Sequence, residues 1–169
     1  SQMLKDEVAL SKEKMKKINL KLIVKSVVDD FNNIYEKKRG IQIILNDSSS
    51  QEEYFINGIE NRIQQIIANL LDNSISFSDN NKKILVEISK DEKERIILKV
   101  IDEGKGFKET STTKIFDRFY SNRPDAFGEH SGLGLNIVKN LVDLHGATIN
   151  ASNNIMQKGA NVEIVFPKA

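Results

Sequence analysis

Apolar residues recur with a helical period in three parts of the chain. This period predicts helices over residues 20–37, 61–77 and 133–145, because side chains three or four positions apart share one face of a helix. Asn19 is placed to cap the first helix, and Gly40 follows its end. The expected apolar faces consist of Leu22, Ile23, Val27, Phe31 and Ile34 in the first helix and of Ile63, Ile66, Ile67, Leu70, Leu71 and Ile75 in the second.

Short apolar runs between these helices predict strands. The runs cover residues 41–45, 54–56, 84–88, 96–101, 147–151 and 162–166. Helices and strands in this order predict an α/β (α+β) two-layer sandwich, in which a mixed sheet carries its helices on one face. Residues 104–132 are rich in Gly, Ser, Thr and charged residues, and this segment is too long for a simple connection.

The first 17 residues are rich in lysine and favour a helix. Leu4, Val8 and Met15 are spaced by four and then seven positions, and Ser11 interrupts the row that they form. Two interpretations fit this imperfect heptad pattern. The segment is either the end of a solvated helix with one apolar stripe or the tail of a helix that dimerises through that stripe.

Composition narrows the functions open to such a fold. The 169 residues include 25 Lys plus Arg and 24 Asp plus Glu, so a broad nucleic-acid surface is not expected. The absence of cysteine excludes disulfides, a thiolate nucleophile and a cysteine zinc site. Two histidines, His130 and His145, do not support a multi-histidine metal centre. No apolar run approaches the roughly 18–20 residues that span a bilayer, and a reducing, cytosolic setting is expected.

Two asparagines stand on the predicted central helix. Asn69 and Asn73 are four positions apart and therefore stack on one face, beside the apolar stripe. Amide groups at the border of a buried face are costly unless they are paired. Their oxygens suit a hard cation such as Mg²⁺ and the phosphates that it carries, whereas bonding to neighbouring backbone is the alternative.

A carboxylate and two glycines follow the strand predicted over 96–101. Asp102 shares the pleat face of the apolar residues before it, so its carboxylate projects from an apolar surface. A carboxylate there can accept a hydrogen bond from the exocyclic amine of adenine and would reject guanine. Gly104 and Gly106 allow the backbone to turn and to approach a ligand closely. An ordinary Asp-Gly turn is the alternative.

Two glycines open the last predicted helix. Gly132, Leu133 and Gly134 lie at its start, where free backbone N–H groups form a ready site for phosphate. A flexible helix entry is the alternative. The spacing matches neither the Walker nor the Rossmann glycine pattern.

An aromatic cluster lies inside the long polar segment. Phe116, Phe119 and Tyr120 indicate either a lid that folds over a ligand, a docking surface, or a local core that fixes the loop. Arg118 and Arg123 could reach phosphate oxygens from the same segment.

The order and spacing of these four motifs resemble the ATP-binding domain of sensor histidine kinases, a branch of the group that also holds DNA gyrase, Hsp90 and MutL. In this comparison residues 69–73 match the N box, 102–106 the G1 box, 116–119 the F box and 132–134 the G2 box. The similarity covers about residues 20–167. Residues 76–78 and 119–124 look closest to the ChvG/ExoS type of sensor kinase.

The resemblance implies a Bergerat fold: a mixed, largely antiparallel sheet backed by three helices, with a mobile ATP lid over about residues 108–131. It implies the cofactors ATP and Mg²⁺, with Asn69 and Asn73 as the catalytic pair and Asn73 as the residue that holds Mg²⁺ on the phosphates. The implied nucleotide-binding residues are Asn69, Asn73, Asp102, Gly104, Gly106, Arg118, Gly132, Leu133 and Gly134, and Phe116, Phe119 and Tyr120 would belong to the lid and F box.

The chain departs from the resemblance at two positions. Relatives that hydrolyse ATP carry a Glu where this chain has Asn69, which cannot act as a general base, so phosphoryl transfer is favoured over hydrolysis. Many family members carry a phosphate-binding Lys where this chain has Ser76. Arg118, Arg123 or Lys105 would have to compensate for that Lys.

The resemblance also implies a phosphoacceptor histidine, and neither His130 nor His145 has the expected sequence around it. Residues 1–18 would then be the end of a dimerisation helix and its linker, and residues 19–169 the ATP-binding catalytic domain. The implied partners are the dimerisation and phosphoacceptor helices of the same full-length protein and a response regulator, without nucleic acid.

The resemblance implies that the full-length protein is a homodimeric two-component sensor anchored in the inner membrane. This chain would then be a cytoplasmic and monomeric fragment of it. A nucleotide-binding regulatory module that resembles anti-sigma factors, or a pseudokinase without catalysis, are the alternatives.

Overall fold

The computed structural model describes residues 14–47, 53–107, 116, 133–153 and 158–169. Its main sheet has five strands in the order β2-β4-β5-β7-β6. These strands are β2 (Gln42–Asp47), β4 (Lys83–Lys90), β5 (Ile96–Asp102), β6 (Thr148–Asn153) and β7 (Ala160–Phe166). The β2–β4 pair is parallel and the other three pairs are antiparallel, so the sheet is mixed and largely antiparallel, as expected.

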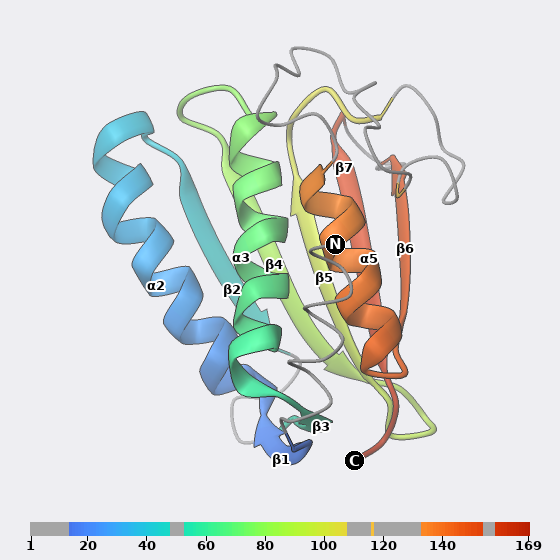
Figure 1. Ribbon diagram of the computed structural model, residues 1–169. Coiled ribbons are helices and arrows are strands. Elements are labelled where there is room, and N and C mark those ends of the chain that lie inside the picture. The colour runs from blue at the N-terminus through green and yellow to red at the C-terminus, as the bar shows by residue number, and fades with distance from the viewer. Residues whose placement is uncertain (1–13, 48–52, 108–115, 117–132, 154–157) are drawn as a thin grey trace.

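Three helices, α2 (Leu20–Arg39), α3 (Glu60–Ser76) and α5 (Leu133–Leu144), cover one face of this sheet (Figure 1). The two-layer sandwich predicted from the sequence is therefore confirmed. Among the described residues, no helix has the length and apolar character needed to cross a membrane.

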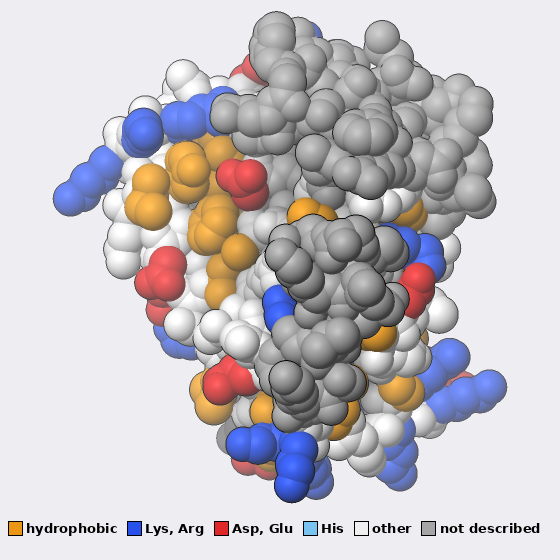
Figure 2. Space-filling view, in the orientation of Figure 1, with side chains coloured by type: hydrophobic (Ala, Val, Ile, Leu, Met, Phe, Trp, Pro, Cys, Tyr) orange, Lys and Arg blue, Asp and Glu red, His pale blue; other side chains and the backbone are white. Residues whose placement is uncertain are grey.

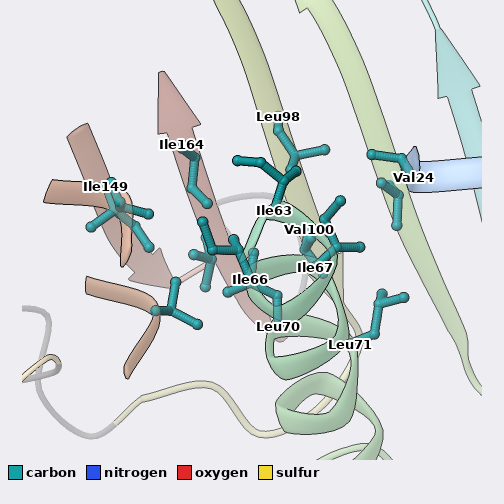
Figure 3. Packing of buried hydrophobic residues seen from close by; sticks show 14 of the residues in the cluster. Val24, Ile63, Ile66, Ile67, Leu70, Leu71, Leu98, Val100, Ile149 and Ile164 are labelled. Atoms are coloured by element: carbon teal, nitrogen blue, oxygen red, sulfur yellow. The ribbon is translucent and has the colours of Figure 1, made fainter. Parts of the chain in front are cut away.

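The central helix α3 supplies the middle of the core. Figure 3 shows Ile66, Ile67 and Leu70 of α3 beside Leu98 and Val100 of β5. Each of these five side chains is at most 2% exposed. Truncating a buried Ile or Leu to Ala destabilises a protein by about 2–5 kcal/mol, so this contact fixes α3 firmly on the sheet.

The apolar face expected for α2 is wrong at two positions, because Leu22 is 64% exposed and Ile34 is 53% exposed. At about 100° per residue, Leu22 points about 200° away from Leu20, which is fully buried. Ile34 shares the side of the helix that Val27 occupies two turns earlier, but α2 leans away from α3 toward its C-terminal end (Figure 1). Hydrophobic side chains reach the surface on this side of the molecule (Figure 2).

The helix expected over residues 1–17 is wrong at Lys16 and Lys17, which form part of strand β1 (Lys16–Asn19). Strand β1 pairs antiparallel with β3 (Phe55–Gly58), and the amide of Leu20 then donates to the carbonyl of Tyr54 at 2.8 Å. Pairing with a distant strand overrides the helical preference of lysine. Residues 1–13 of the expected helix lie outside the described residues.

Candidate functional site

Helix α3 places Asn69 and Asn73 where the sequence predicts them. Both side chains are half-buried, whereas Leu70 and Leu71 between them are at most 2% exposed. The two amides therefore lie at the border of the buried face, one helical turn apart. Among the described residues, no cluster of three His, Cys, Asp or Glu side chains forms a metal cage. Two neutral amide oxygens fit a hard cation that arrives already bound to phosphate oxygens.

The end of α3 binds its own backbone. The Ser76 hydroxyl donates to the carbonyl of Asp72 at 2.8 Å, and the Ser78 hydroxyl donates to the carbonyl of Ser74 at 2.7 Å. The short Ser76 side chain thus engages the helix, whereas a lysine at this position would extend beyond it. Ser76 therefore presents no long, charged side chain at this position.

Asp102 ends β5 with a buried carboxylate. The residue is 1% exposed, and its Oδ1 accepts from the amides of Gly104 at 3.0 Å and Ala160 at 3.1 Å. A buried carboxylate is costly unless hydrogen bonds compensate it, and two backbone donors do so here. The bond to Gly104 is the local turn foreseen as the alternative, but the bond to Ala160 ties Asp102 to β7 and fixes its orientation as well.

Glycine is required at Gly104 and Gly106 for steric reasons. A Cβ atom at Gly104 would collide with the carbonyl oxygen of Phe77. Gly106 has a φ of +79°, and a Cβ atom there would lie 2.5 Å from Oδ1 of Asn153. The loop after β5 therefore packs directly against the end of α3 on one side and against β6 on the other.

A residue that the sequence did not single out, Asn153, fixes this loop. Its Oδ1 accepts from the amide of Phe107 at 2.7 Å, and its Nδ2 donates to the carbonyl of Phe107 at 2.9 Å. The two residues are 46 positions apart, so no local pattern could have identified the pair.

The structure describes some of the remaining residues predicted for the site and leaves out others. Phe116 is 5% exposed and belongs to the hydrophobic core cluster. Gly134 lies in the first turn of α5, and apart from its chain neighbours and the backbone of its own helix no described atom lies within 4 Å of the position its Cβ would take. Leu133 begins α5. The residues Arg118, Phe119, Tyr120, Arg123, His130 and Gly132 lie outside the described residues.

His145 is buried and hydrogen-bonded through both ring nitrogens. It is 6% exposed, and its Nε2 accepts from the amide of Ile59 at 3.2 Å. Nδ1 then carries the proton and donates to the carbonyl of Leu141, 2.7 Å away. Both ring nitrogens are thus engaged in joining the end of α5 to the start of α3.

Glu94, a residue with a lowered pKa, lies away from this site. The hydrogen bond and charge of Lys168, 2.5 Å from the carboxylate, lower the pKa of Glu94. Glu94 precedes β5, and Asp102 ends it, so the Glu94–Lys168 pair lies at the opposite end of that strand.

Comparison with known proteins identifies the class. Residues 58–169 match the family model described as histidine kinase-, DNA gyrase B-, and HSP90-like ATPase, which covers well over half of the chain. The chain belongs to this family. The expected membership of this ATPase group is thereby confirmed.

Individual relatives are sensor kinases. Sensor protein ChvG of Agrobacterium fabrum is 34% identical over 148 residues, which make up 84% of this chain and 25% of that protein. The chain therefore spans about a quarter of the length of this relative.

Solved structures agree on the fold. The nucleotide-free catalytic domain of histidine kinase ThkA has a TM-score of 0.77 and 24% identity, over 92% of this chain and 96% of that one. ThkA in complex with the response regulator TrrA has a TM-score of 0.73 and 24% identity, over 99% of this chain and 47% of that one.

Proposed function

We propose that the chain is the ATP-binding catalytic domain of a sensor histidine kinase of the two-component type. The observation that carries this proposal is the junction of two motifs far apart in sequence. The amide of Phe77 donates to the carbonyl of Asn73 at 3.3 Å, and the carbonyl of Phe77 packs against Gly104, whose amide binds Asp102. The amide-bearing helix and the buried carboxylate thus belong to one site.

The proposed roles follow from the donor chemistry. The Asp102 carboxylate, held by two backbone amides, accepts the exocyclic amine of adenine, and Gly104 and Gly106 let the base lie against the backbone. Asn69 and Asn73 would offer amide oxygens to the Mg²⁺-bound phosphates, and Asn73 would hold the magnesium ion. When bound, that ion supplies charge neutralisation on the triphosphate.

The other nucleotide contacts are proposed from the resemblance. Gly132, Leu133 and Gly134 border the phosphates at the start of α5, where backbone N–H groups favour anions. Arg118 adds a charged contact to the phosphates.

The proposed reaction is transfer of the γ-phosphoryl group to a histidine of the dimerisation domain. The bond from the γ-phosphorus to the bridging oxygen breaks, ADP leaves with that oxygen, and a nitrogen of the acceptor histidine forms the new bond to phosphorus. Asn69 cannot take a proton from water, so the site has no general base at this position to drive hydrolysis. Positioning of the phosphates is then the main contribution of the protein.

The rest of the full-length protein is also a proposal. Residues 1–18 are the end of the dimerisation helix and its linker, and residues 19–169 are the catalytic domain, so β1 spans the boundary between the two parts. The parent protein is a homodimer anchored in the inner membrane, with this domain on the cytoplasmic side. A response regulator is its partner, in line with the solved complex of ThkA with TrrA.

A transfer experiment tests this function. The chain is incubated with Mg²⁺, ATP labelled in the γ-phosphate and a helical-bundle fragment that carries the phosphoacceptor histidine of the same protein. We expect acid-labile label on the fragment and none on the chain. Binding of ATP without transfer, together with capture of a sigma factor, would instead support a regulatory module.

A further inference from the structure

Arg39 is the last residue of α2. All three nitrogens of its guanidinium group donate hydrogen bonds to residues 75–80, the segment that ends α3 and follows it. Nη1 donates to the carbonyl of Ile75 at 2.7 Å, and Nη2 donates to the carbonyl of Ser78 at 2.6 Å. Nε donates to Oδ1 of Asn80 at 2.7 Å. A guanidinium group offers its donors in a rigid plane, so three short bonds fix the segment from several directions at once.

The backbone of Arg39 is held by the same segment. Its carbonyl accepts from the amide of Asn81 at 2.9 Å. Gly40 ends α2 with a φ of +65°, and its amide donates to the carbonyl of Glu36 at 2.9 Å. Because the main chain on both sides is fixed, the Arg39 side chain starts from a defined position and reaches across to α3.

Helix α3 has neither a basic residue nor a left-handed glycine cap of its own at its C-terminal end. Its last turn carries no basic residue, and its C-cap, Phe77, has a φ of −103°, outside the left-handed conformation in which glycine caps a helix. The last carbonyls of a helix lack partners within the helix and carry partial negative charge. The carbonyl of Ile75 accepts from the amide of Ser78 at 3.3 Å, and Arg39 adds a shorter hydrogen bond at 2.7 Å together with a positive charge from a neighbouring helix.

The segment that Arg39 holds runs into the candidate site. The two carbonyls that it binds, those of Ile75 and Ser78, flank Phe77 on both sides. Phe77 in turn bonds to Asn73 through its amide and packs against Gly104 through its carbonyl. Movement of this turn would therefore change the position of Asn73 relative to Gly104 and Asp102.

We propose that Arg39 is a positioning residue for the nucleotide site, which caps α3 from outside and sets the spacing between Asn73 and Asp102. Arg39 lies in α2, before the segment matched by the family model. The proposal rests on the proposed function of that site. It assigns to α2 a part in nucleotide affinity beyond its part in the core.

The test measures the affinity of the full 169-residue chain for an unhydrolysable ATP analogue with Mg²⁺, by titration calorimetry, together with the thermal midpoint. We expect Arg39→Ala to weaken binding by about 10-fold or more, since hydrogen bonds to charged groups are the strong ones. Arg39→Lys keeps the charge without the planar fork, and we expect an intermediate loss. Lys37→Ala, in the same last turn of α2, removes an equal charge and should leave the affinity within twofold.

A second control separates positioning from stability. Val28→Ala truncates a side chain of α2 that is 3% exposed and lies about three helical turns before Arg39, and it lowers the thermal midpoint. At a temperature where every variant is folded, we expect Val28→Ala to bind like the unaltered chain. Equal losses in Val28→Ala and Arg39→Ala would overturn the proposal, as would unchanged affinity in a folded Arg39→Ala.

If Arg39→Ala does not fold, the variants Arg39→Lys and Asn80→Ala test the positioning role of Arg39 instead. Asn80→Ala removes only the partner of Nε, and we expect a loss of about two- to fourfold. Unaltered affinity in both of these variants contradicts a positioning role. Failure of the unaltered chain to bind the analogue is a separate result, because it refutes the proposed function itself before any variant is compared.

Discussion

Gly104 lies so close to the carbonyl oxygen of Phe77 that no side chain fits between the loop after β5 and the end of α3. The close approach joins the two motifs of the site, since Gly104 also donates its amide to Asp102. We predict that Gly104→Ala separates them, because the clash is with a backbone atom and not with a flexible side chain. The expected result is a loss of at least about 10-fold in affinity for the ATP analogue and a lower thermal midpoint.

Gly104→Ala should leave the far side of the sheet intact. The far-ultraviolet circular dichroism spectrum reports whether the strands persist, and calorimetry reports the affinity. A folded Gly104→Ala chain that binds the analogue like the unaltered protein would show that this contact does not hold the site together.

Asp102→Asn tests the adenine assignment. The substitution is nearly isosteric, and an amide oxygen can still accept from Gly104 and Ala160, so the fold should persist. We expect the affinity for the analogue to fall by about 10-fold or more, because a charge-assisted hydrogen bond becomes a neutral one.

The matched control is Glu103→Gln, the adjacent carboxylate. Oε1 of Glu103 accepts from the amide of Lys83 at 2.8 Å, a bond that glutamine retains. We expect Glu103→Gln to bind the analogue within twofold of the unaltered chain. If Asp102→Asn and Glu103→Gln give the same affinity, Asp102 does not bind the base.

The two hydrogen bonds between Asn153 and Phe107 predict that substitution of Asn153 destabilises the chain. Asn153→Ala removes the two hydrogen bonds that Asn153 makes to the amide and the carbonyl of Phe107, and we expect the free energy of unfolding to fall by about 1–3 kcal/mol. Asn150→Ala on the same strand is the control, because Asn150 is exposed. Denaturant titration measures both variants. Equal unfolding free energies for the two variants would show that the hydrogen bonds between Asn153 and Phe107 do not stabilise the fold.

Ser76→Lys tests the departure at the end of α3. A lysine there would carry a positive charge toward the phosphates and would also complement the C-terminal end of a helix whose last turn has no basic residue. We predict several-fold tighter binding of the analogue, with a stronger dependence on salt. Ser76→Ala separates this gain from the loss of the bond to Asp72, and equal affinities in Ser76→Lys and Ser76→Ala would refute the prediction.

The local patterns of the chain were sufficient for most of the fold. The cap at Asn19 is confirmed, since its side chain accepts from the amide of Lys21 at 3.2 Å. The period of α3 and the alternation in β5 also placed Asn73 and Asp102 correctly, because each repeats over many residues.

Apart from Leu22, whose exposure follows from the helical period itself, the errors and omissions have a common physical cause, which is contact between distant segments. Lys16 and Lys17 form a strand only because β3 is available to pair with them. Arg39 binds carbonyls 36 and 39 positions away, and a lysine-rich helix end gives no sign of that role. Ile34 is exposed because of how α2 lies against its neighbour, which the period of one helix does not contain.

The most direct test of the central claim is calorimetric titration of the unaltered chain with an unhydrolysable ATP analogue, repeated at several Mg²⁺ concentrations and with the matching GTP analogue. The account predicts saturable binding of the ATP analogue at one site per chain, tighter as Mg²⁺ increases, and much weaker binding of the GTP analogue. Absence of binding, or equal binding of the two analogues, would contradict it.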